Sequence, residues 1–433
     1  MFNRHVSPTL VILIILLLSG NIFPQDVAGE RYAYKQILKT IRKDIEENYY
    51  DPKFHGIDLE STTNQSSGSI DRAHTVEEMN DIIARYLYQF DDSHLYFIPP
   101  RNTTTVDYGI ETQMIGDKAF ITDVKKGSDA WAKGIRPGDR LYMLEGFIPN
   151  REEFWRLKEH YEAISPQPNL TVIVTKLDGK SYKINFQAKV DQSSVFIPSR
   201  RDLILEDQDW YIKMSHQSFY DEIPGLCIWK MPSFYASEVK LDKMIDRIKK
   251  CPSLIFDLRG NGGGYISGVE QLVANFVDHD VTVGKLVKRK KPGTLSVRSV
   301  GKKAYAGKLI VLVDNASASA TELFTRIIQL EKRGTIVGDR TAGSVMGAVV
   351  FPHELRLESD VHYAISVTEE DIIMSDGGRL EKEGVQPDVE VTPSGPDLFY
   401  SRDPALSRAA AILGFSITPE AAGHIFPKNS EDK

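Results

Sequence analysis

Cysteine is scarce in this sequence, with only Cys227 and Cys251 among 433 residues. Two cysteines are too few for a disulfide scaffold, so cross-links do not hold this fold. The pair could form one bridge or remain as two buried thiols, and the sequence leaves both alternatives open. The sequence also lacks a metal-binding cluster and a nucleotide-binding glycine motif. We therefore expect neither a metal nor a cofactor.

An excess of positive charge is also missing. Lys and Arg number 53 against 60 Asp and Glu, which gives a net charge of −7. This balance argues against the broad basic surface that nucleic-acid binding requires. With 41% hydrophobic and 26% charged residues over this length, the composition is that of a globular protein of two or three domains.

Long hydrophobic runs are absent apart from residues 10–18. As a helix this run would span about 14 Å, less than half of a bilayer core of about 30 Å. Arg4 and His5 precede the run and a more polar stretch follows it, which is the order of a secretory signal. We expect residues 1–29 to be a signal peptide cleaved near residues 27–29. The protein would then be periplasmic or extracellular and would touch a membrane only during export.

Residues 30–100 are predicted to be mainly helical. Apolar residues recur every three or four positions across residues 31–50, which is the pattern of an amphipathic helix. Thr75 and Glu78 have the spacing of a capping box and predict a second helix that begins there. The polar stretch 61–69 leads from the first helix to the second.

Residues 101–190 are predicted to form a β-rich module, because short alternating runs are separated by Gly, Pro and Asp. Four of these runs are expected to be strands: residues 119–124, 140–144, 170–174 and 182–186. Residues 127–139 resemble the PDZ-domain pattern of a short helix, a glycine turn and a Pro-Gly-Asp turn into a strand. By that resemblance the module binds extended peptide ends, and Tyr108, Gly109 and Ile110 hold the terminal carboxylate. The alternative is a structural β-domain without a ligand.

Residues 191–400 alternate between strand and helix patterns. Apolar runs predict strands at residues 225–230, 253–258 and 308–313, and helical patterns lie between them at residues 239–249 and 267–277. Repeated strand–helix–strand units indicate an α/β core with a largely parallel sheet. Residues 401–433 add one helix, around residues 405–413, and a loose polar tail.

Two segments that follow predicted strands contain the strongest functional signals, because ligands of open α/β sheets gather at the carboxyl ends of strands. Residues 257–264 contain four glycines within five residues, and such a turn can present bare N–H groups to an anion. Residues 313–322 crowd small side chains into a strand-to-helix turn. Within it, Ser319 stands three positions before Glu322, which fits a capping box as well as a nucleophile at a helix N-terminus.

Four motifs, in order, resemble those of the carboxyl-terminal processing (tail-specific) and tricorn-core serine peptidases. They are residues 257–264 (DLRGNGGG), 317–322 (SASATE), 338–343 (GDRTAG) and 384–388 (GVQPD). The resemblance implies a crotonase-like α/β peptidase core with an inserted PDZ domain, and it makes Ser319 the nucleophile. It also implies that the backbone amides of Ala320 and of a glycine in the 262–264 turn, first of all Gly263, bind the oxyanion.

The general base is where this sequence departs from the best-known members. The Ser/Lys branch has a lysine 25 positions after the nucleophile, where this chain has Ser344. A serine hydroxyl needs a base, and the tricorn-type branch suggests one. There a histidine is the base, the preceding serine polarises it, and a glutamate just before the last motif completes a tetrad. Carried over to this sequence, the resemblance implies His94, Ser93 and Glu381, with Glu383 as the alternative glutamate. A solvated charge is the non-functional interpretation of either glutamate.

Together these observations predict an exported serine endopeptidase that acts on protein or peptide substrates. The reaction would pass through an acyl-enzyme on Ser319, with His94 as general base. The PDZ module is expected to hold the free carboxyl end of a substrate or to gate access to the site. A catalytically inactive peptide-binding scaffold on the same fold is the main alternative. A carrier of small apolar ligands is the second, because the retinoid-binding proteins of the eye share this core.

Overall fold

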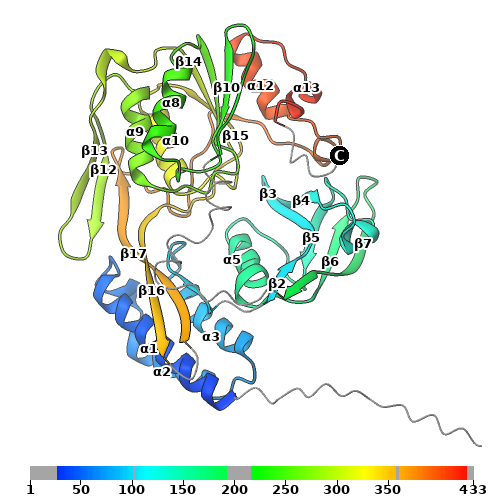
Figure 1. Ribbon diagram of the computed structural model, residues 1–433, viewed down its shortest axis with the longest axis vertical. Coiled ribbons are helices and arrows are strands. Elements are labelled where there is room, and N and C mark those ends of the chain that lie inside the picture. Colours follow the sequence, from blue (N-terminus) through cyan, green and yellow to red (C-terminus); the bar gives the residue numbers. More distant parts are fainter. Residues whose placement is uncertain (1–26, 101–103, 193–215, 357–359, 427–433) are drawn as a thin grey trace, which may run out of the picture.

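The computed structural model describes residues 27–100, 104–192, 216–356 and 360–426. Figure 1 shows a helical N-terminal region, a β-rich module and an α/β core arranged around one another. The hydrophobic run of the predicted signal peptide lies outside the described residues. Within them, no helix has the length and apolar character needed to cross a membrane.

The helical region contains three helices. α1 (Val27–Asn48) includes the helix predicted for residues 31–50, and α3 (Val76–Tyr88) begins directly after Thr75. The Thr75 hydroxyl accepts a hydrogen bond from the Glu78 amide at 3.2 Å, so this half of the expected capping box is present. Both predicted helices are confirmed.

The polar stretch 61–69 is helical, which the sequence did not predict. It forms most of α2 (Leu59–Ile70), whose N-terminus is capped by Asp58 through hydrogen bonds from the amides of Glu60 and Ser61. Its small and apolar side chains pack against α1 and α3. This packing outweighs the weak helix propensity of a segment rich in Ser and Thr.

The β-rich module contains a five-stranded antiparallel sheet in the order β3-β4-β5-β6-β7. Its strands are β3 (Ile110–Ile115), β4 (Lys118–Val124), β5 (Arg140–Leu144), β6 (Asn169–Thr175) and β7 (Ser181–Gln187). A separate pair joins β2 (Thr104–Asp107) to β8 (Lys189–Gln192), and the helices are α4 (Asp129–Ala132) and α5 (Phe154–Glu159). The four predicted strands coincide with β4 to β7.

The α/β core is built on a six-stranded sheet in the order β18-β15-β14-β11-β10-β9. The strands are β9 (Ser218–Ile223), β10 (Leu226–Lys230), β11 (Ser253–Asp257), β14 (Lys308–Val313), β15 (Thr335–Gly338) and β18 (Val389–Glu390). Neighbouring strands are parallel except for β9, which is antiparallel to β10. The three predicted strands of the core are β10, β11 and β14.

Helices cover both faces of this sheet. One face packs against α8 (Glu238–Ile248), α9 (Ile266–Phe276) and α10 (Ala320–Leu330), and the other against α12 (Pro404–Leu413) and α13 (Pro419–Gly423). Side chains of β14 alternate between the two layers: Val311 belongs to the first cluster and Ile310 to the second. The turn that carries Ser319 therefore follows a strand buried on both faces.

The largely parallel sheet was predicted, but a second, antiparallel sheet was not. It contains β1 (Tyr96–Ile98), β12 (Val281–Lys288), β13 (Gly293–Val297), β16 (Met346–Arg356) and β17 (Asp360–Met374). The fold is thus an α/β fold with mixed sheets. The sequence did not reveal this sheet, because most of β16 is exposed or half-buried and lacks a continuous apolar run.

β17 links the helical region to the α/β core. Near its start, Tyr363, Ile365 and Val367 pack into the core of the helical region, and the strand pairs there with β1. Its other end pairs with β12. Figure 1 shows the β16–β17 hairpin running from the core to α1 and α2. The short segment between α3 and β1, which carries His94, is therefore held against the core.

Cys227 and Cys251 are joined by a disulfide, which decides between the two alternatives left open above. The bridge connects the start of β10 with the turn that precedes β11.

Candidate active site

Ser319 stands between β14 and α10 in a strained backbone conformation. Its φ of 55° and ψ of −120° are uncommon for a residue with a side chain. The Ser319 amide donates to Ser344 O at 2.8 Å and to Glu322 Oε2 at 3.1 Å. The hydroxyl faces His94, with 3.4 Å between Ser319 Oγ and His94 Nε2. The sequence allowed either a cap or a nucleophile. The capping box with Glu322 is present, and the Ser319 hydroxyl also lies toward His94.

His94 is anchored by a buried aspartate that the sequence analysis did not single out. Asp92 Oδ1 accepts hydrogen bonds from the His94 amide and from Thr368 Oγ1, both at 2.9 Å. Asp92 Oδ2 accepts from the Tyr49 hydroxyl at 3.0 Å. Since Thr368 belongs to β17 and Tyr49 follows α1, one carboxylate fixes the His94 backbone to both elements.

Ser93 and Glu381 extend the chain of hydrogen bonds behind the imidazole. Ser93 Oγ lies 2.9 Å from His94 Nδ1 and donates to Glu381 Oε2 at 2.9 Å. A carboxylate only accepts, so the Ser93 hydrogen points to Glu381 and its oxygen accepts from Nδ1–H. His94 Nε2 is then unprotonated and can take the proton of Ser319.

Glu381 is fixed in turn by the backbone. Its carboxylate accepts from the Ser93 amide at 3.1 Å and from the Val345 amide at 2.8 Å. The alternative glutamate, Glu383, makes none of these contacts and is exposed. Of the two candidates, the structure brings Glu381 to Ser93 and leaves Glu383 outside.

Burial shifts the pKa values of the two titratable groups in this hydrogen-bonded series, His94 and Glu381. Desolvation lowers the pKa of His94 below its ordinary value, although the charge of Asp92 opposes the shift. Desolvation also raises the pKa of Glu381, while hydrogen bonds from Val345 and Ser93 oppose it. The imidazole is therefore neutral at neutral pH, which is the form a general base requires.

Glu322 joins the Ser319 turn to the loop that contains Ser344. Its carboxylate accepts hydrogen bonds from the Thr341 hydroxyl at 2.5 Å and from the amides of Gly343, Ser344 and Ser319 at 2.8, 2.9 and 3.1 Å. Full burial raises the pKa of Glu322 to about 7, and these four donors oppose the shift. The glutamate of the SASATE motif thus acts mainly as a structural acceptor.

The predicted oxyanion donors are only partly free. Gly263 lies against Ser319, since a Cβ added to it would be 2.8 Å from Ser319 Cβ. Its amide, however, donates to Asn261 Oδ1 at 2.9 Å, which corrects the expectation that Gly263 is the second donor. In the described part of the chain, the amides of Ala320, Gly262 and Gly264 have no hydrogen-bond partner. These three amides are the ones open to a ligand.

The loop proposed to bind a terminal carboxylate is engaged in internal contacts. The buried Tyr108 hydroxyl donates to Tyr161 O at 2.9 Å, and the Gly109 amide donates to Asp107 Oδ1 at 2.8 Å. Ile110 begins β3, which is the edge strand of the module's sheet. Tyr108 and Gly109 are therefore structural in this conformation, whereas the outer edge of β3 is unpaired among the described strands.

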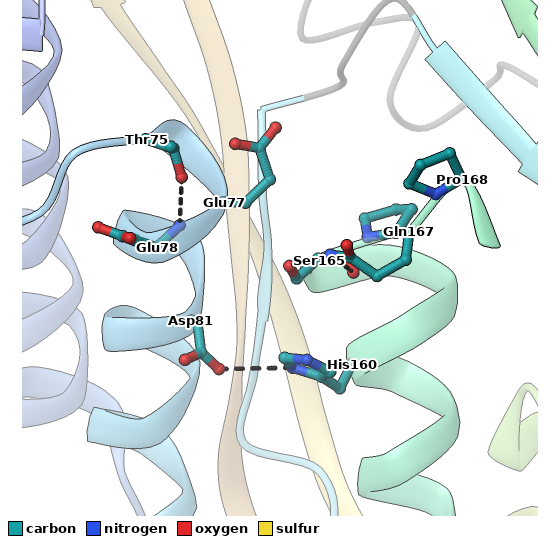
Figure 2. Close-up of a pocket in the computed structure, with 9 residues that line it drawn as sticks. Thr75, Glu77, Glu78, Asp81, His160, Ser165, Gln167 and Pro168 are labelled. Atoms are coloured by element: carbon teal, nitrogen blue, oxygen red, sulfur yellow. Dashed lines mark hydrogen bonds and ion pairs between the residues drawn. The ribbon is translucent and has the colours of Figure 1, made fainter. Parts of the chain in front are cut away.

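A cavity of about 450 Å³ lies between the start of α3 and the turn that follows α5. Figure 2 shows the acidic side chains that line this cavity. Among them, Asp81 Oδ1 lies 3.4 Å from His160 Nδ1. Over the described ranges, no group of three or more His, Cys, Asp or Glu side chains is arranged to hold a metal ion.

Two functional contacts escaped the sequence analysis: those of Asp92 and of the Ser344 hydroxyl. For Glu322 the capping box predicted the contact with Ser319 but not the contacts with residues 341–344. Asp92 directly precedes Ser93, so its position in the Asp-Asp-Ser-His run was the available signal. Ser344 was considered only as the residue that replaces a lysine. Its hydroxyl donates to Ser93 Oγ at 2.9 Å, a contact between residues 251 positions apart that no local pattern reveals.

Two family models match parts of the chain. Residues 225–391 match the model of peptidase family S41, and residues 31–87 match the C1 domain of tricorn protease. The S41 match contains Ser319, Ser344 and Glu381. Ser93 and His94 lie outside both matched ranges.

Individual relatives are similar over most of the chain. A probable CtpA-like serine protease of Staphylococcus haemolyticus is 23% identical over 386 residues, which are 88% of this chain and 72% of the relative. A tail-specific protease of Haemophilus influenzae is 25% identical over 379 residues, which are 80% of this chain but only 50% of the relative.

Solved structures share the fold at low sequence identity. Mature CPAF has a TM-score of 0.65 and 13% identity, with 86% of this chain and 94% of that chain covered. The photosystem II D1 C-terminal processing protease has a TM-score of 0.52 and 16% identity, with 90% and 99% covered.

Proposed function

The chain belongs to the serine-type peptidases of family S41, and we propose that it is an exported endopeptidase that cleaves protein or peptide substrates. The observation that supports this proposal best is the hydrogen-bonded series Ser319, His94, Ser93 and Glu381. Three segments far apart in the sequence place these residues: one carries both Ser93 and His94, and the other two carry Ser319 and Glu381. Their side chains nevertheless form one hydrogen-bonded series.

The geometry supports the following course of reaction. Ser319 Oγ forms a bond to the substrate carbonyl carbon while His94 Nε2 takes the hydroxyl proton. The negative carbonyl oxygen is stabilised by the Ala320 amide and by a second amide of the 262–264 turn. When the C–N bond breaks, His94 gives its proton to the leaving amine. A water molecule, deprotonated by His94, then hydrolyses the acyl-enzyme and restores Ser319.

Ser93 and Glu381 support the base during this cycle. The imidazole gains a positive charge when it takes the Ser319 proton, and Nδ1–H donates to Ser93 Oγ. Ser93 passes the polarisation on to the Glu381 carboxylate. No net proton transfer to Glu381 is required, because the carboxylate acts through orientation and electrostatic attraction.

We further propose that the β-rich module is a PDZ domain that adds the free carboxyl end of a substrate as a strand beside β3. The unpaired outer edge of β3 supports this role. The module also contacts the core beside the nucleophile turn, since Gln113 Nε2 donates to Asp314 Oδ2 at 2.8 Å. To bind a carboxylate, the Gly109 amide would have to exchange Asp107 for the ligand.

Export is supported by the hydrophobic N-terminal segment and by the disulfide between Cys227 and Cys251. Disulfides persist mainly in the periplasm and outside the cell. We propose cleavage of the signal peptide near residues 27–29, which form the first turn of α1.

The purified chain should cleave an unfolded protein, and a serine-directed fluorophosphonate should label it. Ser319→Ala should abolish both signals, and His94→Ala should reduce each by at least about 1,000-fold, because the nucleophile and its base act as one unit. Full cleavage by either variant would disprove the assignment. Tight binding of carboxyl-terminal peptides without turnover or labelling would instead favour a non-catalytic scaffold.

A further inference from the structure

Ser344 occupies the position where the Ser/Lys branch has its base, and it contacts both halves of the proposed catalytic site. Its carbonyl oxygen accepts the Ser319 amide at 2.8 Å, and its own amide donates to Glu322 Oε2 at 2.9 Å. Its hydroxyl donates to Ser93 Oγ at 2.9 Å. The backbone of one residue thus holds the nucleophile turn, while its side chain reaches the serine behind the base.

The Ser344 hydroxyl completes the hydrogen bonding of Ser93. A serine hydroxyl offers one donor and two acceptor sites. Ser93 uses its donor for Glu381 Oε2, and its two acceptor sites receive His94 Nδ1–H and the Ser344 hydroxyl. With all three sites occupied by protein groups, the Ser93 hydroxyl has no free site for water and no alternative partner toward which to rotate.

From this arrangement we infer that Ser344 is a positioning residue: its hydroxyl locks Ser93 in the orientation that keeps the proton of His94 on Nδ1. The inference rests on the proposed function and adds a fifth side chain to it. Ser344 does not need to touch the substrate, because it acts through Ser93 and His94. The serine that replaces a lysine is then a functional part of this site.

A matched pair of variants tests the role of the hydroxyl. Thr and Val have nearly the same shape, but only Thr keeps a hydroxyl. Ser344→Val and Ser344→Ala should each lower kcat about tenfold with KM unchanged, whereas Ser344→Thr should keep kcat within about threefold of the original chain. Equal kcat values for the Thr and Val variants, or a loss that appears in KM alone, would overturn the inference.

A double-mutant cycle separates this role from a general structural effect. If Ser344 acts through Ser93, then adding Ser344→Ala to a Ser93→Ala chain should cause no further loss of kcat. A further tenfold loss in that background would show that Ser344 acts independently of Ser93, and the inference would fail.

A readout without turnover distinguishes failure of the inference from failure of the proposed function. The nitrogen chemical shifts of ¹⁵N-labelled histidine should report a single Nδ1–H tautomer for His94 in the original chain and in Ser344→Thr. A mixture of tautomers should appear in Ser344→Val. If the original chain shows the single tautomer but no cleavage, the peptidase proposal fails and the positioning role remains. If Ser344→Val keeps the single tautomer, the positioning role fails, whatever the activity.

Discussion

His94 Nε2 lies 3.4 Å from Ser319 Oγ although 225 positions separate the two residues in the sequence. Ser319 is placed by the α/β core, whereas His94 is placed by the segment between α3 and β1. Asp92 connects the two parts, because its carboxylate binds the His94 amide and the Thr368 hydroxyl of β17. The geometry of the proposed catalytic pair therefore depends on the helical region packing against β17.

The first prediction concerns the pH dependence of cleavage. Because burial lowers the pKa of His94, the base stays neutral below the ordinary histidine value of about 6.5. We expect the acid limb of the kcat/KM profile to have its midpoint below about pH 6.5, measured with a peptide substrate. Asp92→Asn removes a charge that opposes the shift, so it should move the midpoint further down. A midpoint above 7 in the original chain would contradict this reasoning.

The free energy of unfolding should also depend on the protonation of His94. The folded chain holds His94 with a lowered pKa, so the unfolded chain binds a proton first as the pH falls. The contribution of His94 to the free energy of unfolding is therefore complete above about pH 6.5 and declines between this value and the lower folded-state pKa. Urea unfolding of the original chain and of His94→Gln across this range measures the contribution. If the unfolding free energies of the two chains differ by the same amount at every pH, the lowered pKa of His94 does not contribute to stability.

The sequence predicted most of the parallel sheet, because its strands leave local signals. The family resemblance, not a local signal, pointed to Ser319, His94, Ser93 and Glu381, and the structure brings these side chains together. β10, β11 and β14 are continuous apolar runs, and the motifs follow their carboxyl ends. The antiparallel strands β12, β13, β16 and β17 were missed. β16 and β17 pack partly against the helical region, whereas β12 and β13 pack against the α/β core. Which face of each strand is covered is a tertiary relationship that no short window of sequence contains.

The fine geometry of the site was less predictable for a related reason. The sequence gives glycines at residues 262–264, but it does not indicate which amide is free. Asn261 Oδ1 occupies the Gly263 amide, and only the folded turn shows this. In the same way, Asp257 and Arg259 of the first motif turn out to be structural. Arg259 forms ion pairs with Asp257 and with Asp403 at the start of α12.

The second prediction concerns Glu322. Glu322→Ala would leave the amides of Gly343 and Ser344 without their acceptor in a buried site. The Ser319 amide would lose one of its two acceptors and keep Ser344 O. An unsatisfied buried donor costs about 1–3 kcal/mol, so we expect the free energy of unfolding to fall by roughly 3–5 kcal/mol, with activity lost as the two loops separate. Urea unfolding and fluorophosphonate labelling measure the two effects.

A surface glutamate provides the control for this substitution. Glu47 is 60% exposed and forms a loose pair with Lys43 at 3.9 Å. Glu47→Ala should change the free energy of unfolding by less than about 0.5 kcal/mol. If Glu322→Ala is no more destabilising than Glu47→Ala, the four hydrogen bonds do not support the site.

The third prediction tests how the β-rich module is attached to the core. Arg151 donates to Asp339 Oδ2 at 2.7 Å, and its side chain is only 7% exposed. It also donates to the carbonyl oxygens of Gly116 and Arg340. Arg151→Ala leaves a buried carboxylate without its cation, which costs about 3–5 kcal/mol. We expect faster hydrogen exchange at the Gly116 amide, which donates to Asp339.

Lys180→Ala is the matched control, because the 73% exposed side chain of Lys180 lies in the same module and pairs with Asp178 at the surface. It should leave exchange at Gly116 unchanged. Unaltered exchange in Arg151→Ala would mean that the ion pair does not hold the module in place.

The fourth prediction compares two glycines of one turn. Gly263 and Gly260 both have positive φ, at 101° and 74°, so alanine strains the backbone at either position. Only at Gly263 would the new Cβ meet the proposed nucleophile, 2.8 Å from Ser319 Cβ, whereas at Gly260 no atom lies within 4 Å of the new Cβ.

Both variants should lose about 1–2 kcal/mol of stability. Gly263→Ala should also lose about 100-fold in kcat, because it displaces Ser319 from His94, and Gly260→Ala should stay within about threefold of the original chain. Equal activities of the two variants would show that close contact with Gly263 does not position the nucleophile.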